Sequence, residues 1–414
     1  MNLIPTQMPT MPQSTATPTQ AHDPLKGIRV VDFTIVMSGP LCTRALADAG
    51  ADVIKIEPPA GDMVRNRPPT RSGISTYFGS MNCGKRSIVL DLSTPDGREI
   101  ALALALQADV IVENFRPGVM KRLGLDYETL AKSRPGLIYC SISGFGQEGP
   151  MAHAPAYAPV IHAASGLDTA NMGYQPDPSR PGNNGIFIAD VLGASQAASA
   201  IHLALFDRER TGKGQSIDVS LMDAVLGMLV YETQVAQYPT SKRRQVYEPV
   251  RSRDGFVMVA AVTPKNMEAL FDLIGFPEGK TDPRFSNTRT KEENWSELLR
   301  IIEAWTSQHS STECEARMMD AGVPCARYRT VTEALAEPQV DFRGTLSEVG
   351  TAEEPFKVVN AAYQLSGSRV KARRLVPILG QHTEEVLHEI LGASEEQLDA
   401  WRDKGVFGAA KTAA

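Results

Sequence analysis

Hydrophobic residues gather in short runs that alternate with helical patterns along the first half of the chain. Six runs rich in Val and Ile are typical of buried strands; they cover residues 28–33, 52–57, 86–92, 109–113, 137–141 and 216–220. Patterns with helical period lie between or after them, at residues 40–49, 94–107, 126–133, 187–208 and 221–237. This alternation predicts βαβ units and a parallel sheet, and therefore a doubly wound, Rossmann-like α/β domain.

The same patterns divide the chain into four segments. Residues 1–22 carry no Lys, Arg, Asp or Glu and predict a flexible leader. A large domain is expected over residues 23–225, with a loop over 145–186 in it. A smaller α+β domain with its linkers is expected over residues 226–330, including helices at 264–274, 293–308 and 311–321. Residues 331–414 return to the large domain and close with helices at 382–391 and 394–404.

Composition narrows the class of protein. The chain has 414 residues, with 42 Lys and Arg against 48 Asp and Glu, so its formal net charge of -6 does not favour nucleic acid as a partner. Five widely spaced cysteines without a C-x-x-C pair indicate reduced thiols in a cytoplasmic protein rather than disulfides or zinc. Seven histidines show no ligand spacing, so no metal site is expected. No apolar run approaches the roughly 20 residues of a membrane helix, so no membrane association is expected.

A glycine-rich segment follows the fifth predicted strand. Residues Gly144–Gly149 match G-x-G-x-x-G, but Pro150 follows at once, where a dinucleotide site requires a helix. The match therefore favours a tight turn near an active site over a nicotinamide or flavin site.

Two kinds of charged residue stand out near the predicted strand ends and the long helix. Basic residues follow several strands, where open α/β sheets bind ligands, and a phosphate-rich ligand would need such a cluster; they are Lys55, Lys85, Arg86, Arg116 and Arg122. Asp190 stands at the start of the Ala-rich helix. It is either an N-cap or a carboxylate nucleophile kept ionised by the helix dipole, and spacing alone does not separate these interpretations.

Eight segments in register, from about residue 25 to the end, resemble the family III CoA-transferases, which include formyl-CoA and carnitine CoA-transferases and the α-methylacyl-CoA racemases. The segments are Val30–Phe33 with Gly39-Pro40, Gly50–Glu57, Asn82–Ser87, Leu90–Leu92 with Thr94–Gly97, Glu113–Gly118, Ser143–Gln147, Arg210–Gln215 and Gly380–Thr383. The family's nucleophile is an Asp 21 residues before the Thr of the R-T-G-x-G-Q turn. Since that Thr is Thr211, the resemblance implies that Asp190 is the nucleophile.

The resemblance also implies an assembly and a mechanism. Two chains would thread through each other as an interlocked homodimer. An acyl-CoA would transfer its CoA to a carboxylic acid by a ping-pong exchange, through an aspartyl mixed anhydride and an aspartyl-CoA thioester at Asp190. CoA and acyl-CoA would be substrates, without a tightly bound cofactor.

Carried over position by position, the resemblance implies a set of CoA contacts. These are Val36 and Met37 after the first strand, with Lys85, Asn114, Phe115 and Arg122 near the adenine or the phosphates. Phe115 has core packing as an equal alternative. Backbone N–H groups in the turn containing Gly144 and Gly146 would hold developing oxyanions.

Two departures from the family pattern bear on the substrate. Ala158 stands where the racemases have an Asp, and deprotonation at an α-carbon needs a base, so a racemase or isomerase is the weaker alternative. The glycine-run lid of the formyl-CoA branch is replaced by a basic segment over residues 241–253. This segment is either a solvated linker or the source of an Arg for a dicarboxylic donor such as succinyl-CoA, from Arg243, Arg244, Arg251 or Arg253. A non-catalytic CoA-binding subunit is a further alternative.

Overall fold

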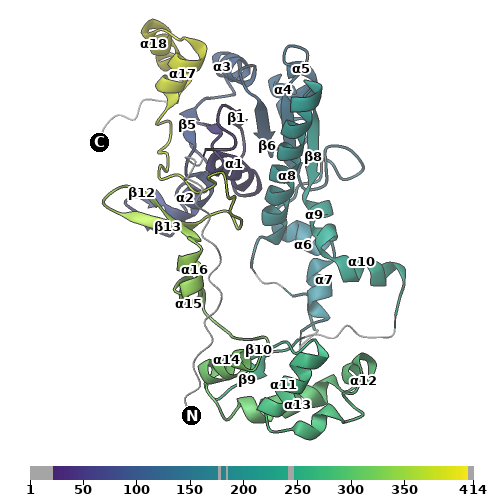
Figure 1. Cartoon of the computed structure of the whole chain (residues 1–414). Helices are drawn as coiled ribbons and strands as arrows, with labels where there is room; N and C mark the ends of the chain where they lie inside the picture. The colour runs from purple at the N-terminus through teal and green to yellow at the C-terminus, as the bar shows by residue number, and fades with distance from the viewer. Residues whose placement is uncertain (1–21, 176–178, 183–184, 241–246, 409–414) are drawn as a thin grey trace. The chain divides into compact units, whose positions relative to one another are not determined.

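The computed structural model describes residues 22–175, 179–182, 185–240 and 247–408. The chain divides into two compact units (Figure 1). The larger comprises Met1–Val230 and Gly344–Ala414, and the smaller comprises Tyr231–Arg343. The sequence placed these boundaries after residues 225 and 330.

A parallel sheet of six strands forms the centre of the larger unit. The strands are β1 (Arg29–Asp32), β2 (Asp52–Glu57), β5 (Arg86–Val89), β6 (Val110–Glu113), β7 (Ile138–Ser143) and β8 (Ser216–Ser220). Their order is β5-β2-β1-β6-β7-β8, and every neighbouring pair is parallel. This is the doubly wound order 3-2-1-4-5-6, so the predicted fold class and its six strands are confirmed.

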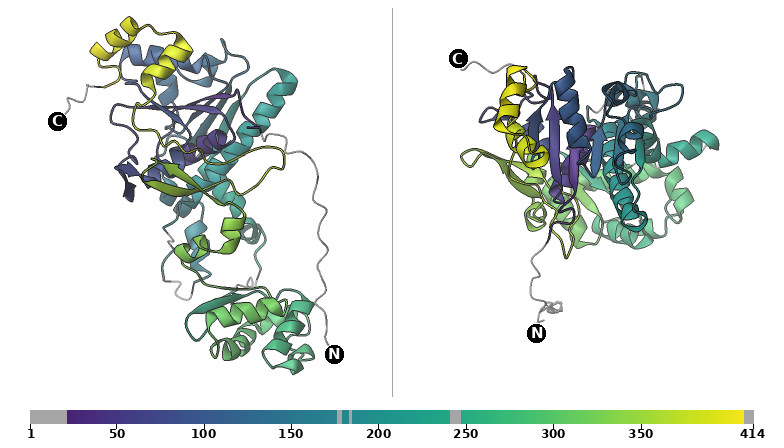
Figure 2. Two further views of the ribbon diagram at one scale, coloured as in Figure 1. Left: turned by 60° about the vertical axis from the view of Figure 1, so that its left-hand side comes forward. Right: turned by 90° about the horizontal axis from the view of Figure 1, so that it is seen from above.

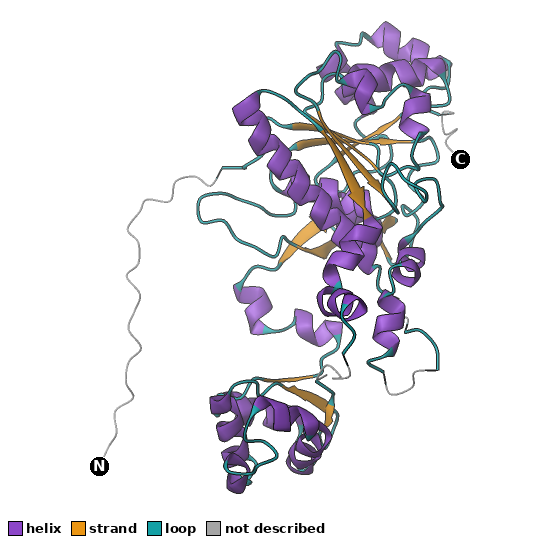
Figure 3. Ribbon diagram, turned by 90° about the vertical axis from the view of Figure 1, so that its right-hand side faces the viewer, coloured by secondary structure: helices purple, strands orange, loops and turns teal. Residues whose placement is uncertain are grey.

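Helices cover both faces of this sheet (Figures 2 and 3). One hydrophobic cluster joins the sheet to α1 (Ser38–Asp48), α6 (Ala158–Ala164), α8 (Ile188–Thr211) and α9 (Leu221–Met228). A second cluster joins the opposite face to α3 (Pro95–Ala105), α4 (Val119–Leu123), α5 (Tyr127–Leu130), α17 (Thr383–Leu391) and α18 (Glu395–Asp403). Helix α17 packs beside α3, and α18 contributes to the same apolar cluster, which shows why the chain must return to this unit after residue 343.

The strand order reverses between β1 and β6, the two strands that begin the two halves of the fold. The loops that follow them, residues 33–37 and 114–118, therefore leave the carboxyl edge of the sheet in opposite directions. Ligands of open α/β sheets bind in the crevice at such a reversal. The fold thus directs the search for a site to these two loops.

Short elements that the sequence did not predict complete the larger unit. They are α2 (Thr76–Asn82), α4, α6, α7 (Leu167–Met172) and the hairpins β3 (Thr70–Arg71)–β4 (Ile74–Ser75) and β12 (Leu346–Gly350)–β13 (Pro355–Val359). Two predictions need correction. The expected loop over 145–186 contains α6 and α7, and the helix expected over 221–237 is broken at Leu229, whose ψ of 52° ends α9 before α10 (Val230–Gln237).

The smaller unit combines a three-stranded antiparallel sheet with a cluster of helices, as the α+β pattern predicts. The strands are β9 (Val250–Arg251), β10 (Phe256–Val259) and β11 (Cys325–Arg327). The helices are α11 (Pro264–Leu273), α12 (Thr288–Glu293), α13 (Trp295–Thr306), α14 (Ser311–Asp320), α15 (Val331–Leu335) and α16 (Pro338–Phe342), with a 3-10 turn at Pro277–Lys280. One apolar cluster joins the sheet to α11, α13 and α14.

Helix α8 corrects the expectation that no apolar segment is long enough to cross a membrane. Of the helices that the structure describes, it alone is long and apolar enough to cross a membrane, with 24 residues. It also packs against α1, α6, α9, β7 and β8 and is partly buried by them. A core helix of a soluble protein passes the same test, so α8 is weak evidence for a membrane span.

Candidate active site

Asp190 lies in the first turn of α8, at the third helical residue. The N-cap of this helix is Phe187, whose side chain makes no capping hydrogen bond, so the N-cap interpretation of Asp190 is wrong. The N–H of Ala189 is instead accepted by Nε2 of His162 on α6, at 3.1 Å. A neighbouring helix thereby fixes the turn that carries Asp190, and the carboxylate is left available for other contacts.

Two opposing effects set the protonation of Asp190. Burial of the half-buried carboxyl raises its pKa from 3.8 to about 6, and a hydrogen bond from the Ser38 side chain lowers it. Burial therefore outweighs the hydrogen bond. The carboxylate is still mostly ionised at pH 7, and desolvation makes it more basic than an exposed Asp.

Ser38 is held in place by the two loops at the strand-order reversal. The Asn114 side chain accepts a hydrogen bond from Ile35 N and donates one to Ile35 O, both at 2.9 Å. The same Asn114 amide donates to the Ser38 hydroxyl at 3.4 Å. The loop after β6 thus positions the loop after β1, and through Ser38 it reaches Asp190.

Val36 has an unusual backbone conformation in the loop after β1. Its φ of 67° lies in the left-handed region, which a β-branched residue rarely adopts. Its N–H points at the carboxylate of Asp62, at 3.3 and 3.4 Å. Asp62 is ion-paired with Lys55 in the interior, and the Lys55 ammonium also donates to Thr34 O at 2.7 Å. A buried ion pair therefore supports a strained turn in the loop that lines both cavities with Asp190.

Lys85 does not reach the ligand side of the sheet. Its side chain is fully buried, and its ammonium donates to Asp32, to Asn82 and to the carbonyl of Pro40 at 2.8–3.0 Å. Because a lysine ammonium has three protons, none is left for a phosphate. The structure thus contradicts the expected CoA contact of Lys85; its role is to compensate Asp32, which accepts hydrogen bonds from the N–H and hydroxyl of Thr34.

Two cavities meet at Asp190 and share Val36, Met37 and Tyr157 with it. The first, about 300 Å³, is also lined by Ser38, Gly144 and residues 114–117, and is called the Asn114 cavity. The second, about 330 Å³, is called the Arg67 cavity. It is also lined by Met63, Arg67, Tyr77, Ala158, Pro159 and Phe187.

The remaining predicted contacts are placed as follows. Phe115 lines the Asn114 cavity and also packs on a core cluster, so its core packing is confirmed and its contact with CoA stays a prediction. Gly144 lines the same cavity, whereas Gly146 adopts a φ of 89° beside Asp218 in a turn that opens no helix. Arg122 is exposed on α4 and lines neither cavity. The structure therefore brings together Val36, Met37, Asn114, Phe115 and Gly144 with Asp190.

Several residues of this site escaped sequence reasoning. Ser38 gave no signal beyond its place next to Gly39-Pro40, and Arg67, Tyr77 and Tyr157 lie in segments without a recognisable motif. The structure explains why glycine precedes proline in the Gly39-Pro40 motif. A Cβ there would come within 2.3 Å of the Thr34 side chain, so only glycine permits α1 to begin this close to the loop after β1.

The basic segment over 241–253 lies partly outside the described residues, since Arg243 and Arg244 fall in 241–246. Arg253 pairs with Glu313 at 3.3 Å, and Arg251 lies 5.1 Å from the ring centroid of Phe256. Both contacts are within the smaller unit. The proposed role of these arginines in binding a second carboxylate stays a prediction.

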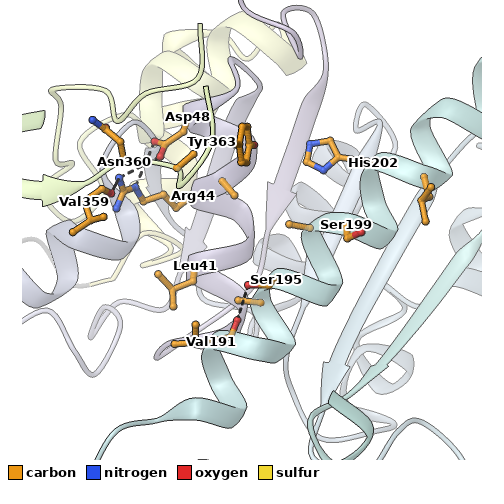
Figure 4. A pocket seen from close by; sticks show the side chains of 15 residues that line it. Leu41, Arg44, Asp48, Val191, Ser195, Ser199, His202, Val359, Asn360 and Tyr363 are labelled. Atoms are coloured by element: carbon orange, nitrogen blue, oxygen red, sulfur yellow. Dashed lines mark hydrogen bonds and ion pairs between the residues drawn. The ribbon is translucent and has the colours of Figure 1, made fainter. Parts of the chain in front are cut away.

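A third, larger cavity of about 680 Å³ lies between α1, α8 and the segment after β13 (Figure 4). Its charged side chains have partners within the protein, since Arg44 pairs with Asp48 and donates to Val359 O. Apolar residues dominate the rest of its wall, among them Leu41, Val191 and Leu203. It has no contact with Asp190, and we therefore assign the chemistry to the other two cavities. No group of three or more His, Cys, Asp or Glu side chains suited to a metal ion occurs among the described residues.

Known proteins that this chain resembles over most of its length are CoA-transferases and members of their family. The family model for CoA-transferase family III matches residues 25–383. An acetyl-CoA:oxalate CoA-transferase of Acetobacter aceti is 39% identical over 349 residues, covering 82% of this chain and 89% of that protein. A succinyl-CoA:glutarate CoA-transferase of Mus musculus is 32% identical over 396 residues, covering 93% and 90%. The crystal structure of a CAIB/BAIF family protein from Brucella suis matches with a TM-score of 0.78 and 32% identity, over 90% of this chain and all of that one.

The fold and the sequence therefore define an α/β enzyme of the CoA-transferase class. The chain belongs to CoA-transferase family III.

Proposed function

We propose that this protein transfers CoA from an acyl-CoA to a small carboxylic acid, with Asp190 as the covalent nucleophile. The observation that carries the proposal is the position of one ionisable carboxylate where two cavities meet. The acyl group and the CoA thiol would enter from different sides and meet at Asp190. CoA acts as a substrate, and no tightly bound cofactor takes part.

The chemistry follows from the leaving groups. Asp190 attacks the thioester carbonyl, and CoA leaves as a thiolate, which gives a mixed anhydride on the enzyme. The thiolate attacks the aspartyl carbonyl and releases the donor acid, which leaves an aspartyl-CoA thioester. The acceptor carboxylate then reverses both steps. The net reaction exchanges one thioester for another of similar energy, so no nucleotide is consumed.

The small carboxylate substrate is supported by the relatives. Their names give oxalate, glutarate and citramalate as acids, and acetyl-CoA and succinyl-CoA as donors. Succinyl-CoA is the donor that we propose. The acyl group fits the Arg67 cavity, whose volume of about 330 Å³ is suited to a short chain.

Ala158 argues against a racemase or isomerase. It lines the Arg67 cavity beside Asp190, where a second acid-base group would be needed for exchange at the α-carbon. A racemase would exchange the α-proton of acyl-CoA in deuterium oxide without any acceptor acid. We expect no such exchange, and its appearance by mass spectrometry would favour the racemase.

Initial-rate kinetics test the proposed function. With succinyl-CoA and a panel of short mono- and dicarboxylic acids, double-reciprocal plots should be parallel, as a ping-pong exchange requires. Intersecting lines would contradict a covalent enzyme intermediate. Binding of CoA without turnover across the panel would favour a non-catalytic subunit.

We also propose that the protein works as a homodimer. The support is the exposed apolar surface on α8, where Leu203 and Phe206 are about two-thirds exposed and Leu203 also lines the cavity of about 680 Å³. Light scattering should give the mass of two chains, and a monomer at micromolar concentration would contradict the proposal. Interlocking and a cytoplasmic location stay predictions, tested by a dimer that resists dilution and by cell fractionation.

A further inference from the structure

The wall of the Arg67 cavity is apolar apart from a few groups. Met37, Met63 and Phe187 supply hydrophobic surface, and Asp190 lies at the junction with the other cavity. Arg67 is the one cationic residue that lines it. A cavity of this kind suits a short hydrocarbon chain with an anionic end.

The guanidinium of Arg67 is free to bind a ligand. Among the described residues it makes no hydrogen bond or ion pair, and Arg67 is exposed. Arg65, two positions earlier, differs in both respects: it donates to both carboxylate oxygens of Glu57 at 2.5 and 2.6 Å, and it lies 4.0 Å from the ring centroid of Phe78. Arg65 is therefore a structural residue, whereas the charge of Arg67 is not used by the fold.

The backbone that carries Arg67 is nevertheless fixed. Its N–H donates to Val64 O at 3.1 Å, and its carbonyl accepts a hydrogen bond of 2.5 Å from the buried hydroxyl of Ser75. Pro68 follows and restricts the conformation of Arg67 further. The side chain therefore extends from a defined point on the cavity wall.

Tyr77 connects the two charges of the cavity. Burial raises the pKa of its phenol; the positive charge of Arg67 lowers it, and the negative charge of Asp190 raises it. The phenol also donates a hydrogen bond to Met37 Sδ at 3.6 Å. One side chain thus lies within electrostatic reach of both Arg67 and Asp190.

We propose that Arg67 determines the substrate class by binding the distal carboxylate of a dicarboxylic acyl group whose thioester carbonyl faces Asp190. The inference rests on the proposed function and adds the residue that would make the enzyme prefer dicarboxylic over monocarboxylic substrates. A guanidinium offers two parallel donors to a carboxylate, and such a charge-assisted contact favours one substrate over its uncharged analogue. A CoA phosphate is the alternative ligand for Arg67. The Asn114 cavity already offers a phosphate a cation, because Arg116 lines its wall.

Succinyl-CoA and butyryl-CoA test this assignment, because both carry four-carbon acyl groups and only the first has a distal carboxylate. We expect Arg67→Met to lower the kcat/KM for succinyl-CoA relative to that for butyryl-CoA by about 10- to 100-fold. This is the effect expected from the loss of one hydrogen bond between charged groups. Arg67→Lys should retain part of the preference. Arg116→Met, the matched control, should lower both kcat/KM values together and leave the ratio unchanged.

An equal loss for both donors in Arg67→Met would overturn the proposal and assign Arg67 to a CoA phosphate. An unchanged ratio would overturn it as well. Calorimetric binding of the two donors to Asp190→Asn, with and without Arg67→Met, separates recognition from turnover. If the wild type exchanges no acids but the preference for succinyl-CoA in binding still depends on Arg67, then the proposed function fails and this inference stands.

Discussion

The two cavities at Asp190 differ in how their polar groups are used. In the Asn114 cavity, the amide of Asn114 is bonded in both directions to Ile35 and supports Ser38, so the polar wall is fixed by the fold. In the Arg67 cavity, the guanidinium of Arg67 has no partner among the described residues, and Met63 and Phe187 add apolar side chains to the wall. The first arrangement suits an invariant ligand such as CoA. The second suits the acid, which changes from one relative to the next.

This difference also follows from the topology. The Asn114 cavity is built by loops that leave β1, β6 and β7 at the edge of the sheet where the strand order reverses. Such a site is a property of the doubly wound fold itself. Met63, Arg67 and Tyr77 of the other cavity lie instead on the segment between β2 and β5, so they can vary without a change in the sheet.

The largest effect is expected from the carboxylate that both cavities share. Asp190→Asn should lower CoA transfer on the order of 10⁴-fold, because an amide is not a nucleophile for a thioester. The measurement is the rate of succinyl-CoA-dependent exchange at pH 7. Asp168→Asn is the control, since Asp168 also lies in the first turn of a helix but lines neither cavity. Equal losses in the two variants would mean that Asp190 acts only through stability.

A smaller effect is expected from the hydroxyl that supports Asp190. In the wild type, kcat/KM should fall as the pH drops through about 6, because the attacking carboxylate is then protonated. The Ser38 hydrogen bond lowers this pKa, so Ser38→Ala should move the acid limb to higher pH and reduce the rate at pH 7 by up to about tenfold.

The control for Ser38 is Ser195→Ala. Ser195 is also in α8, but its hydroxyl donates to Val191 O at 2.9 Å and not to Asp190. Its pH profile should match the wild type. An acid limb that stays in place in Ser38→Ala would remove the assigned role of this hydroxyl.

The smallest effect concerns stability on the Asn114 side. Burial raises the pKa of Glu113 from 4.5 to about 7, although Ser141 and the N–H of Phe115 donate to it. Between pH 4.5 and about 7, the folded state therefore keeps a proton on Glu113 that the unfolded state releases. The free energy of unfolding decreases over this range as the pH rises, by at most about 3 kcal/mol. Glu113→Gln should be more stable than the wild type at pH 8 and not at pH 4.5, as measured by denaturant unfolding. Equal stability at both pH values would contradict the raised pKa.

The sequence predicted the sheet well, because its strands are continuous Val- and Ile-rich runs that are buried on both faces, such as Val110–Glu113. It failed where local patterns are weak. Helix α6 begins with Ala158-Pro159 in a Gly- and Pro-rich stretch, and nothing in that stretch signalled that His162 would hold the start of α8. The apolar length of α8 was also missed, because Asp190 and small polar residues interrupt its run.

The candidate site was also predicted only where its residues lie in recognisable sequence patterns. The resemblance identified Asp190 together with the two loops that contain Val36 and Asn114, because these occur in recognisable motifs. It also assigned Lys85 to CoA, since a sequence does not show that a lysine at the start of a strand turns inward to meet a buried Asp32. The sequence could not identify Arg67 as a site residue, because a single exposed arginine belongs to no recognisable pattern. Only the cavity that it lines distinguishes it from other surface charges.

The account depends on Asp190 becoming acylated, and trapping that intermediate tests it most directly. The full-length protein is incubated with succinyl-CoA and hydroxylamine, digested, and analysed by mass spectrometry. The result we predict is a hydroxamate on the side chain of Asp190, formed only when the donor is present and absent from Asp190→Asn. An enzyme that exchanges CoA between acids at full rate while Asp190 stays unmodified, or while another residue carries the hydroxamate, would contradict the account.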